Sequence, residues 1–290
     1  MPAATNAGVN IHYVTEGDPA AEPLLLVMGL GAQLTAWHPD FKAALVARGF
    51  FVVSFDNRDV GLSTWLDEAG AADLIAGLSG TATAPYLLSD MAADATAVLD
   101  AEGIDSAHVV GASMGGMIAQ TLAIEHPGRL RSLTSIMSTT GAPAVGQPHP
   151  GVIEVLLTPP PGERAARIDQ SVRGARAISS PGYPFDEARA RARAEADYDR
   201  AYHPEGTARQ AFAILASGDR TEALGQVQVP TLVVHGDADP LVDVSGGRAT
   251  AAAIPGAELT IFPGMGHDLP PALHVPVADA IAALAGTPRA

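Results

Sequence analysis

The chain contains the stretch Val109-Val110-Gly111-Ala112-Ser113-Met114-Gly115-Gly116-Met117, which predicts a buried strand that turns directly into a helix. Such a turn leaves no room for side chains two residues on either side of its apex. Gly111 and Gly115 relieve that crowding, and the strained turn pushes Ser113 outward. The Ser113 hydroxyl is then expected above the sheet, at the positive end of the following helix, where a developing oxyanion is stabilised.

The residues around this stretch strengthen the prediction. The apolar run Ala107-His108-Val109-Val110 precedes the turn, and the helical run from Met117 to Ile124 stops before Pro127. In a chain with 30 glycines the pattern Gly-x-Ser-x-Gly also arises by chance, so the strand before it and the helix after it carry the argument. The alternative is a glycine-rich turn whose serine has no chemical role.

Composition excludes several classes of function. The 290 residues, 47% of them hydrophobic, are enough for one large core with an inserted segment. A net charge of -15 makes nucleic acids and anionic membrane surfaces poor partners. The absence of cysteine excludes disulfides, thiolate catalysis and cysteine-bound metals. The longest apolar run, Leu24 to Leu30, is too short to span a bilayer, and residues 1–10 lack a signal-peptide pattern, so we expect a cytoplasmic protein without integral membrane association.

Strand and helix patterns alternate along the core of the chain. Continuous apolar runs predict strands buried on both faces of a parallel sheet, and amphipathic runs between them predict helices. The predicted strands are residues 9–14, 24–28, 50–55, 107–110, 130–138, 231–235 and 258–262, and the predicted core helices are residues 37–48, 89–102, 117–124 and 275–284. Ser89 is expected to cap the second of these helices and Gly103 to end it. This order predicts an α/β fold with a parallel sheet.

The alternation breaks between residues 141 and 220. Prolines punctuate this segment, and Ala/Arg-rich runs predict helices over residues 161–178 and 185–201, with no strand signal. We therefore expect a helical cap (residues 141–220) inserted into a core of residues 1–140 and 221–290, because its helices need that core to cover their apolar faces. The alternative is a helical decoration at the periphery, away from any site.

Three residues suited to nucleophilic catalysis follow predicted strands. Ser113, Asp239 and His267 each come just after a strand, and the carboxyl ends of parallel strands line one crevice. A serine hydroxyl is a poor nucleophile until a base removes its proton. An imidazole can take that proton, and a carboxylate can fix the imidazole's tautomer. The spacing of histidines and carboxylates does not resemble a metal site, so no metal is expected.

Four motifs resemble the α/β-hydrolase superfamily, and more narrowly its aclacinomycin methylesterase-like branch and related mycobacterial lipases and esterases. They are Met28-Gly29-Leu30-Gly31-Ala32-Gln33, Phe55-Asp56-Asn57-Arg58-Asp59-Val60-Gly61-Leu62-Ser63, Gly111-Ala112-Ser113-Met114-Gly115-Gly116 and Pro263-Gly264-Met265-Gly266-His267. The order Ser, Asp, His along the chain is also the order of that superfamily's catalytic triad. The resemblance covers essentially the whole chain. In one departure, many relatives have His-Gly where this chain has Met28-Gly29.

The resemblance implies a fold and a set of site residues. The fold would be an eight-stranded, mostly parallel sheet with helices on both faces and a helical cap after the sixth strand. No cofactor is implied. The implied site residues are Ser113 as nucleophile, Asp239 as acid and His267 as base, with the backbone N–H groups of Leu30 and Met114 as the oxyanion hole.

Other residues compete for roles at the site. Asp237 is a rival to Asp239, but the family places the acid just before a proline, which favours Asp239. Arg58 is expected to tie down its own loop by hydrogen bonds, and His235 to be a packed, hydrogen-bonded histidine. The residues that could line the substrate pocket, or could simply belong to the core, are Gly29, Trp37, Met137, Tyr183, Phe185 and Met265.

We interpret the sequence as a carboxylesterase that cleaves a small, largely apolar carboxylic ester through an acyl-enzyme intermediate. Its expected partner is that small-molecule ester, and a homodimer is left open. The same fold and triad also serve thioester or phospholipid hydrolysis, carbon–carbon bond hydrolysis and cofactor-free perhydrolysis. Some proteins of this fold are small-molecule receptors with slow turnover. Haloalkane dehalogenation is excluded, because it needs an aspartate nucleophile where Ser113 stands.

Overall fold

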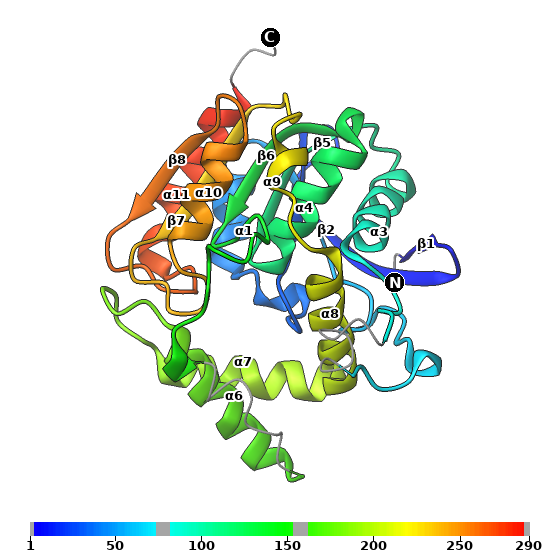
Figure 1. The fold of residues 1–290 in the computed structure, drawn as a ribbon, viewed down its shortest axis with the longest axis vertical. Coiled ribbons are helices and arrows are strands. Elements are labelled where there is room, and N and C mark those ends of the chain that lie inside the picture. Colours follow the sequence, from blue (N-terminus) through cyan, green and yellow to red (C-terminus); the bar gives the residue numbers. More distant parts are fainter. Residues whose placement is uncertain (1–2, 74–81, 153–161, 287–290) are drawn as a thin grey trace.

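An eight-stranded sheet forms the centre of the molecule (Figure 1). The structure, a computed structural model, describes residues 3–73, 82–152 and 162–286. The strands are β1 (Ala3–Asn6), β2 (Val9–Glu16), β3 (Glu22–Val27), β4 (Phe50–Phe55), β5 (Ala107–Ala112), β6 (Leu130–Ile136), β7 (Thr231–Gly236) and β8 (Glu258–Phe262). Their order in the sheet is β1-β2-β4-β3-β5-β6-β7-β8. Only the β1–β2 and β2–β4 pairings are antiparallel, which confirms a mostly parallel sheet. The apolar pattern did not predict β1.

Helices cover both faces of this sheet. The α-helices are α1 (Pro39–Val46), α3 (Leu88–Ala101), α4 (Met114–Glu125), α6 (Arg164–Ile178), α7 (Glu187–Ala201), α8 (Pro204–Ser217), α9 (Thr221–Leu224), α10 (Ser245–Ala253) and α11 (Pro271–Ala285), and the short 3-10 helices are η1 (Leu34–Ala36), η2 (Asp67–Ala69) and η3 (Pro127–Arg129). None of the described helices is both long enough and apolar enough to cross a membrane.

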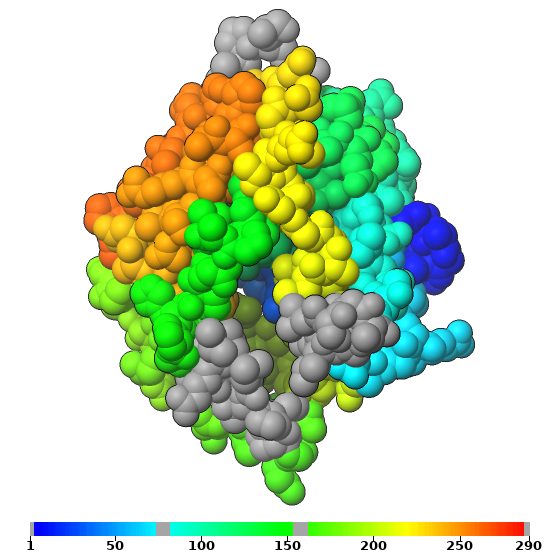
Figure 2. Space-filling view, in the orientation of Figure 1, coloured from blue at the N-terminus to red at the C-terminus, as the bar shows by residue number. Residues whose placement is uncertain are grey.

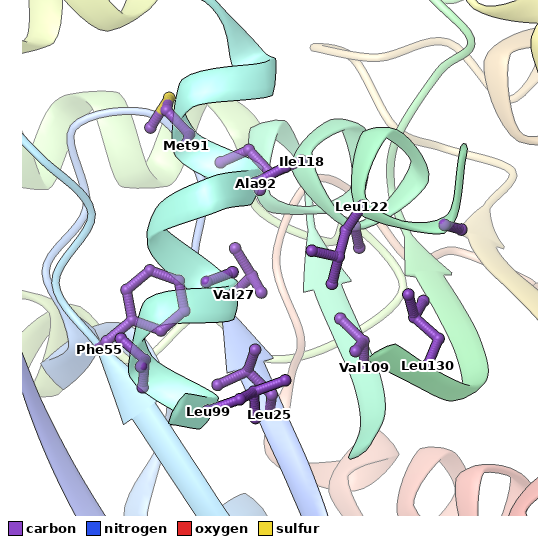
Figure 3. Close-up of a cluster of buried hydrophobic side chains, with 14 of the residues drawn as sticks. Leu25, Val27, Phe55, Met91, Ala92, Leu99, Val109, Ile118, Leu122 and Leu130 are labelled. Carbon is purple, nitrogen blue, oxygen red and sulfur yellow. The ribbon is translucent and has the colours of Figure 1, made fainter. Parts of the chain in front are cut away.

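Neighbouring residues of the central strands point to opposite faces, which gives the sheet two apolar layers. In β3, Leu25 and Val27 belong to the layer that includes α3 and α4, whereas Leu24 and Leu26 belong to the layer that includes α1 and α11. Figure 3 shows the first layer, with Leu25 packed beside Leu99 of α3. Burying one such leucine stabilises the fold by about 1.5–3 kcal/mol. Burial on both faces explains why the strands are continuous apolar runs.

The chain leaves the sheet after β6 and returns to it at β7. This excursion carries α6, α7 and α8, which lie beyond the end of the sheet toward which the β6 arrow points (Figure 1). Its two ends meet, because the backbone N–H of Arg220 donates to Thr140 O at 2.9 Å and the Arg220 guanidinium donates to Thr139 O at 3.1 Å. Figure 2 shows an opening between the green segment that follows β6 and the yellow α8–α9 segment.

The helices of this excursion match the sequence-based expectation in part. The two predicted helices are present as α6 and α7, although Pro161, the expected start of the first, lies outside the described residues. The sequence analysis did not predict α8 as a helix. Its apolar face is short, and Pro204 at its first position is as compatible with a turn as with a helix start.

The predicted cap of α3 was wrong. The helix begins at Leu88, so Ser89 lies within its first turn and does not cap it. Instead, the carboxylate of Asp90 accepts a hydrogen bond from the backbone N–H of Leu87 at 2.8 Å. An acidic side chain in the first turn also suits the positive end of the helix dipole.

Two further helix starts were misplaced for a common reason. α1 begins at Pro39 rather than Trp37, and α11 begins at Pro271 rather than Val275. Proline is well suited to the first helical position, because the N–H that it lacks would have no partner inside the helix. The apolar periodicity used to set the expected starts took no account of these prolines.

Two glycine-to-alanine substitutions in helices of the inserted segment should change stability in opposite directions. A Cβ on Gly206 of α8 would lie 2.0 Å from the carbonyl oxygen of Asp59, whereas a Cβ on Gly174 of α6 would meet no atom within 4 Å. We expect Gly206→Ala to destabilise the protein by about 1–3 kcal/mol through overpacking. Gly174→Ala should stabilise it by about 0.5–1 kcal/mol, because alanine is the better helix former. Urea unfolding of both variants checks this, and equal effects would contradict the close docking of α8.

Candidate active site

Ser113 occupies a strained turn between β5 and α4. Its φ of 56° and ψ of -122° are unusual for a residue with a side chain, and such a conformation costs about 1–3 kcal/mol. A Cβ on Gly111 would lie 2.0 Å from Gly115 O, and a Cβ on Gly115 would lie 2.0 Å from Val27 O. Both glycines are therefore required by close backbone contacts, which confirms the crowding expected from the sequence.

A continuous chain of hydrogen bonds links Ser113, His267 and Asp239. The Ser113 Oγ lies 2.9 Å from His267 Nε2, and His267 Nδ1 lies 2.8 Å from Asp239 Oδ2. Because an ionised carboxylate can only accept, the Nδ1 atom carries the proton and Nε2 is left to accept the serine hydroxyl. His267 and Asp239 are buried, and Ser113 is partly exposed. This arrangement can remove a proton from the serine as it attacks a carbon centre.

Several hydrogen-bond donors surround the Asp239 carboxylate and stabilise its ionised form. Burial by itself raises the pKa of this carboxyl, but hydrogen bonds from His235, His267 and the Val242 N–H outweigh it and hold the pKa well below its usual range. Asp239 Oδ1 accepts from the backbone N–H groups of Leu241 and Val242, each at 2.9 Å. The side chain therefore stays ionised across the neutral pH range.

His235 stands behind the carboxylate as a second histidine. Its Nε2 lies 2.8 Å from Val242 O and 3.4 Å from Asp239 Oδ2. A carbonyl only accepts, so Nε2 donates to it; among the described residues, the buried Nδ1 has no hydrogen-bond partner. The expectation of a packed, hydrogen-bonded histidine is confirmed. Its contact with Asp239 was not foreseen, although the two residues are four apart at the end of β7.

Asp237 points away from this chain of hydrogen bonds. Its Oδ1 accepts from the backbone N–H of Gly264 at 2.7 Å and so ties the loop after β7 to the loop after β8. The structure brings Asp239, and not Asp237, to His267.

The two proposed oxyanion donors flank Ser113. Met114 is the first residue of α4, and the first N–H groups of a helix have no partner inside it. On the other side, a Cβ on Gly29 would lie 3.0 Å from Ser113 Cβ, so the loop carrying Leu30 packs directly against the serine. Within the described residues the Leu30 N–H has no hydrogen-bond acceptor. The Met28 carbonyl, where many relatives have histidine, accepts from Asn57 Nδ2 at 2.8 Å.

The candidate pocket residues separate into two groups. Trp37, Met137 and Met265 are buried in the apolar layer that includes α1 and α11. Tyr183 is half-buried and packs against the same layer, whereas the ring of Phe185 lies 4.6 Å from the Arg176 guanidinium. A role in lining the pocket stays a prediction for each of them.

Helices α6, α7 and α8 each contact a loop that carries a candidate site residue. The His267 N–H donates to Ile178 O at the end of α6, at 2.8 Å. Gln33 Nε2 donates to Asp197 O of α7 at 2.7 Å, and the Gly31 N–H donates to Gln210 Oε1 of α8 at 2.8 Å. The sequence analysis gave Gln33 and Gln210 no role, because a buried glutamine does not reveal its partner in the sequence.

Among the described residues, one group of side chains has atoms close enough to share a metal ion. The ligand atoms of His38, Asp40 and His274 lie within 4.8 Å of one another. However, His38 Nδ1 already accepts from the Asp40 N–H at 3.1 Å, at the positive N-terminal end of α1. Both features oppose a cation there. The group shares no residue with the hydrogen-bonded chain at Ser113.

A model of the alpha/beta hydrolase fold family matches residues 22–270. The chain belongs to the α/β-hydrolase family. The strand order, the turn at Ser113 and the chain order of Ser113, Asp239 and His267 agree with this membership.

Similar proteins indicate which kind of reaction to expect of this α/β-hydrolase. Rhodomycin D methylesterase DnrP of Streptomyces peucetius is 32% identical over 298 residues, with 96% of each chain covered. A putative carbamate hydrolase, RutD of Variovorax paradoxus, is 28% identical with 89% of each chain covered. Among solved structures, a meta-cleavage product hydrolase from Pseudomonas fluorescens IP01 has a TM-score of 0.76 at 19% identity, over 97% of this chain and 96% of that one. The methylesterase relative places the chain in the methylesterase-like branch, and the relatives support ester-hydrolysing activity, whereas the solved structure agrees with the fold alone.

Substitutions at the two aspartates after β7 should separate their roles. We expect Asp239→Asn to lower kcat by about 10⁴-fold, because an amide facing His267 favours the wrong imidazole tautomer. Asp237→Asn keeps an oxygen that can accept from Gly264 and should change kcat far less. Steady-state kinetics on an activated ester measure both. A larger loss at Asp237 would show that the acid had been assigned to the wrong residue.

Proposed function

We propose that the protein is a carboxylesterase that cleaves a small, largely apolar carboxylic ester through an acyl-enzyme intermediate. The observation that carries this proposal is the unbroken Ser113–His267–Asp239 hydrogen-bond chain, with links of 2.9 and 2.8 Å. This chain supports the proposed roles of Ser113 as nucleophile, His267 as its base and Asp239 as the acid that orients the base.

Acylation follows from this geometry. Ser113 Oγ attacks the ester carbonyl carbon while its proton passes to His267 Nε2, and the carbonyl electron pair moves onto oxygen. The N–H groups of Leu30 and Met114 stabilise that oxyanion. When the carbonyl re-forms, the C–O bond to the alcohol breaks, and the alcohol leaves with the proton from His267. The acyl group remains on Ser113.

Deacylation repeats these steps with water. A water molecule loses its proton to His267 Nε2 and attacks the acyl carbon, and the same two N–H groups stabilise the second oxyanion. The bond to Ser113 Oγ then breaks, the serine takes the proton back from His267, and the carboxylic acid is released. Asp239 stabilises the imidazolium formed in both halves of the cycle.

The size of the substrate is inferred from the inserted segment. We propose that residues 141–220 form a cap over Ser113, which the contacts of α6, α7 and α8 with the site loops support. A capped site favours a monomeric substrate over a polymer or a lipid surface. The relative named a rhodomycin D methylesterase makes a methyl or similarly small alcohol group the natural first choice.

Replacement of the nucleophile tests the proposed chemistry. Ser113→Ala should fold like the parent, and its kcat should fall by about 10⁴- to 10⁶-fold. A fluorophosphonate probe should label the parent at Ser113 and leave the variant unlabelled. Ser106→Ala, just before the opposite end of β5, is the matched control and should label normally. Activity retained in Ser113→Ala would overturn the proposal.

The acyl-chain preference tests the capped site. For p-nitrophenyl esters from acetate to palmitate, each methylene that is buried should contribute about 0.8 kcal/mol, or about a four-fold rise in kcat/KM, until the pocket is full. We expect a maximum at short or medium chains. A steady rise to palmitate, with a jump where the ester forms micelles, would instead indicate an open, interfacial lipase.

A further inference from the structure

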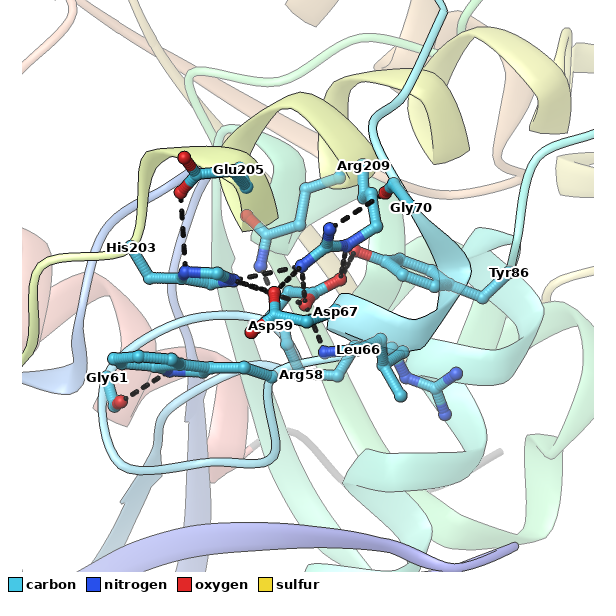
Figure 4. A network of polar contacts seen from close by, with 12 residues as sticks. Arg58, Asp59, Gly61, Leu66, Asp67, Gly70, Tyr86, His203, Glu205 and Arg209 are labelled. Atoms are coloured by element: carbon cyan, nitrogen blue, oxygen red, sulfur yellow. Dashed lines mark hydrogen bonds and ion pairs between the residues drawn. The ribbon is translucent and has the colours of Figure 1, made fainter.

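Helix α8 is docked onto the loop after β4 by a buried ion pair (Figure 4). The Arg209 guanidinium donates to both carboxylate oxygens of Asp59, at 2.9 and 2.7 Å, and neither side chain is more than 2% exposed. Asp59 also accepts from the Tyr86 hydroxyl at 2.8 Å and from the Leu66 N–H at 2.7 Å. A bidentate pair fixes orientation as well as distance.

This docking brings the adjacent residue of α8, Gln210, onto two site loops. Gln210 is fully buried. Its Oε1 accepts from the Gly31 N–H at 2.8 Å, and its Nε2 donates to Arg58 O at 2.7 Å. The orientation of the amide is set by chemistry, because a backbone N–H can only donate and a carbonyl can only accept. One side chain thus joins the loop after β3 to the loop after β4.

The loop after β3 is packed tightly on either side of Leu30. Before it, a Cβ on Gly29 would lie 3.0 Å from Ser113 Cβ. After it, Gly31 has a φ of 65° and approaches α8 so closely that a Cβ would lie 2.7 Å from Thr207 Oγ1. The Gly31 N–H belongs to the peptide unit that follows Leu30, so the hydrogen bond that it donates to Gln210 restrains the direction of the Leu30 N–H.

We propose that Gln210 is a positioning residue for the oxyanion hole, acting through Gly31 on the N–H of Leu30. The inference rests on the carboxylesterase function proposed above. A donor stabilises a developing oxyanion only when it is held in place before the reaction, so the restraint matters in the transition state more than in substrate binding.

The first test is the substitution Gln210→Met, which keeps the length of the side chain and removes both hydrogen bonds. Removing an oxyanion donor outright lowers kcat by about 10²- to 10³-fold. A donor that is present but poorly aimed should cost less, so we expect kcat on p-nitrophenyl butyrate to fall by about 10- to 100-fold. KM should change by less than about three-fold.

Two inhibitors distinguish a misdirected Leu30 N–H from a general loss of binding at the site. A trifluoromethyl ketone forms a hemiketal oxyanion with Ser113, whereas the matching methyl ketone binds as a neutral carbonyl. In Gln210→Met, the inhibition constant of the trifluoromethyl ketone should rise by about the same factor as kcat falls. That of the methyl ketone should stay within about three-fold of the parent value.

The matched control is Gln120→Met. Gln120 is also fully buried, and its amide donates to Ser135 Oγ at 3.1 Å and accepts from the Arg220 Nε at 3.3 Å. The control loses the same chemical group without touching the loop after β3. We expect a comparable fall in thermal midpoint and a kcat within about three-fold of the parent.

A conservative variant guards against failure of Gln210→Met to fold. Gln210→Glu keeps an oxygen that can accept from Gly31, and its buried carboxyl, protonated beside the Arg58 carbonyl, can donate to Arg58 O in place of the amide, so it should retain kcat within about five-fold of the parent. The inference is overturned if Gln210→Met and Gln120→Met lose kcat equally, if the loss appears in KM alone, or if Gln210→Glu is as impaired as the Met variant. Failure of the proposed function is distinct, because the parent would then hydrolyse no ester or Ser113→Ala would stay active.

Discussion

The close approach of α4 to the end of β3 is the contact on which the site depends. A single Cβ at Gly115 would overlap Val27 O at 2.0 Å, so this approach is possible only with glycine. The strand that ends at Val27 continues directly into the loop carrying Leu30, and the helix that begins after Ser113 carries Gly115. The same contact therefore sets the separation of the nucleophile from one of its proposed oxyanion donors. The strained backbone of Ser113 persists because the packing of the surrounding sheet and helix fixes the turn in this conformation.

A second constraint is electrostatic and comes from the loop after β4. Asp56 and Asp59 are fully buried, and each pairs with an arginine from the inserted helices: Arg200 of α7 donates to Asp56 at 2.7 Å, and Arg209 of α8 to Asp59. Buried ion pairs contribute little net stability compared with apolar packing, but breaking one leaves an uncompensated charge. These pairs therefore favour one placement of α7 and α8 on the core. They place two of the chain's few basic residues against buried carboxylates, in a chain whose net charge is -15.

Much of the fold could be predicted from the sequence because it depends on local patterns. Buried strands such as residues 24–28 are continuous apolar runs, and the glycines around Ser113 mark their turn. Helix starts were less predictable, because Ser89 and Pro39 each have more than one compatible position in a first turn. The role of Gln210 was out of reach, because its partner Gly31 is 179 positions away and nothing local marks the contact.

The two halves of the site are anchored in different ways, and this has a chemical consequence. Asp239, the proposed acid, is held by the core, through backbone N–H groups and His235 at the end of β7, whereas His267, the proposed base, is held by α6 through its bond to Ile178 O. The loop after β3, which carries the proposed donor Leu30, is held by the inserted helices: Gln33 donates to Asp197 O of α7, and the Gly31 N–H donates to Gln210 of α8. A substrate that shifts α8 on binding would move the proposed donor at Leu30, whereas His267 depends on its separate contact with α6. Discrimination between esters could then arise in oxyanion stabilisation, and so in kcat, rather than in binding alone.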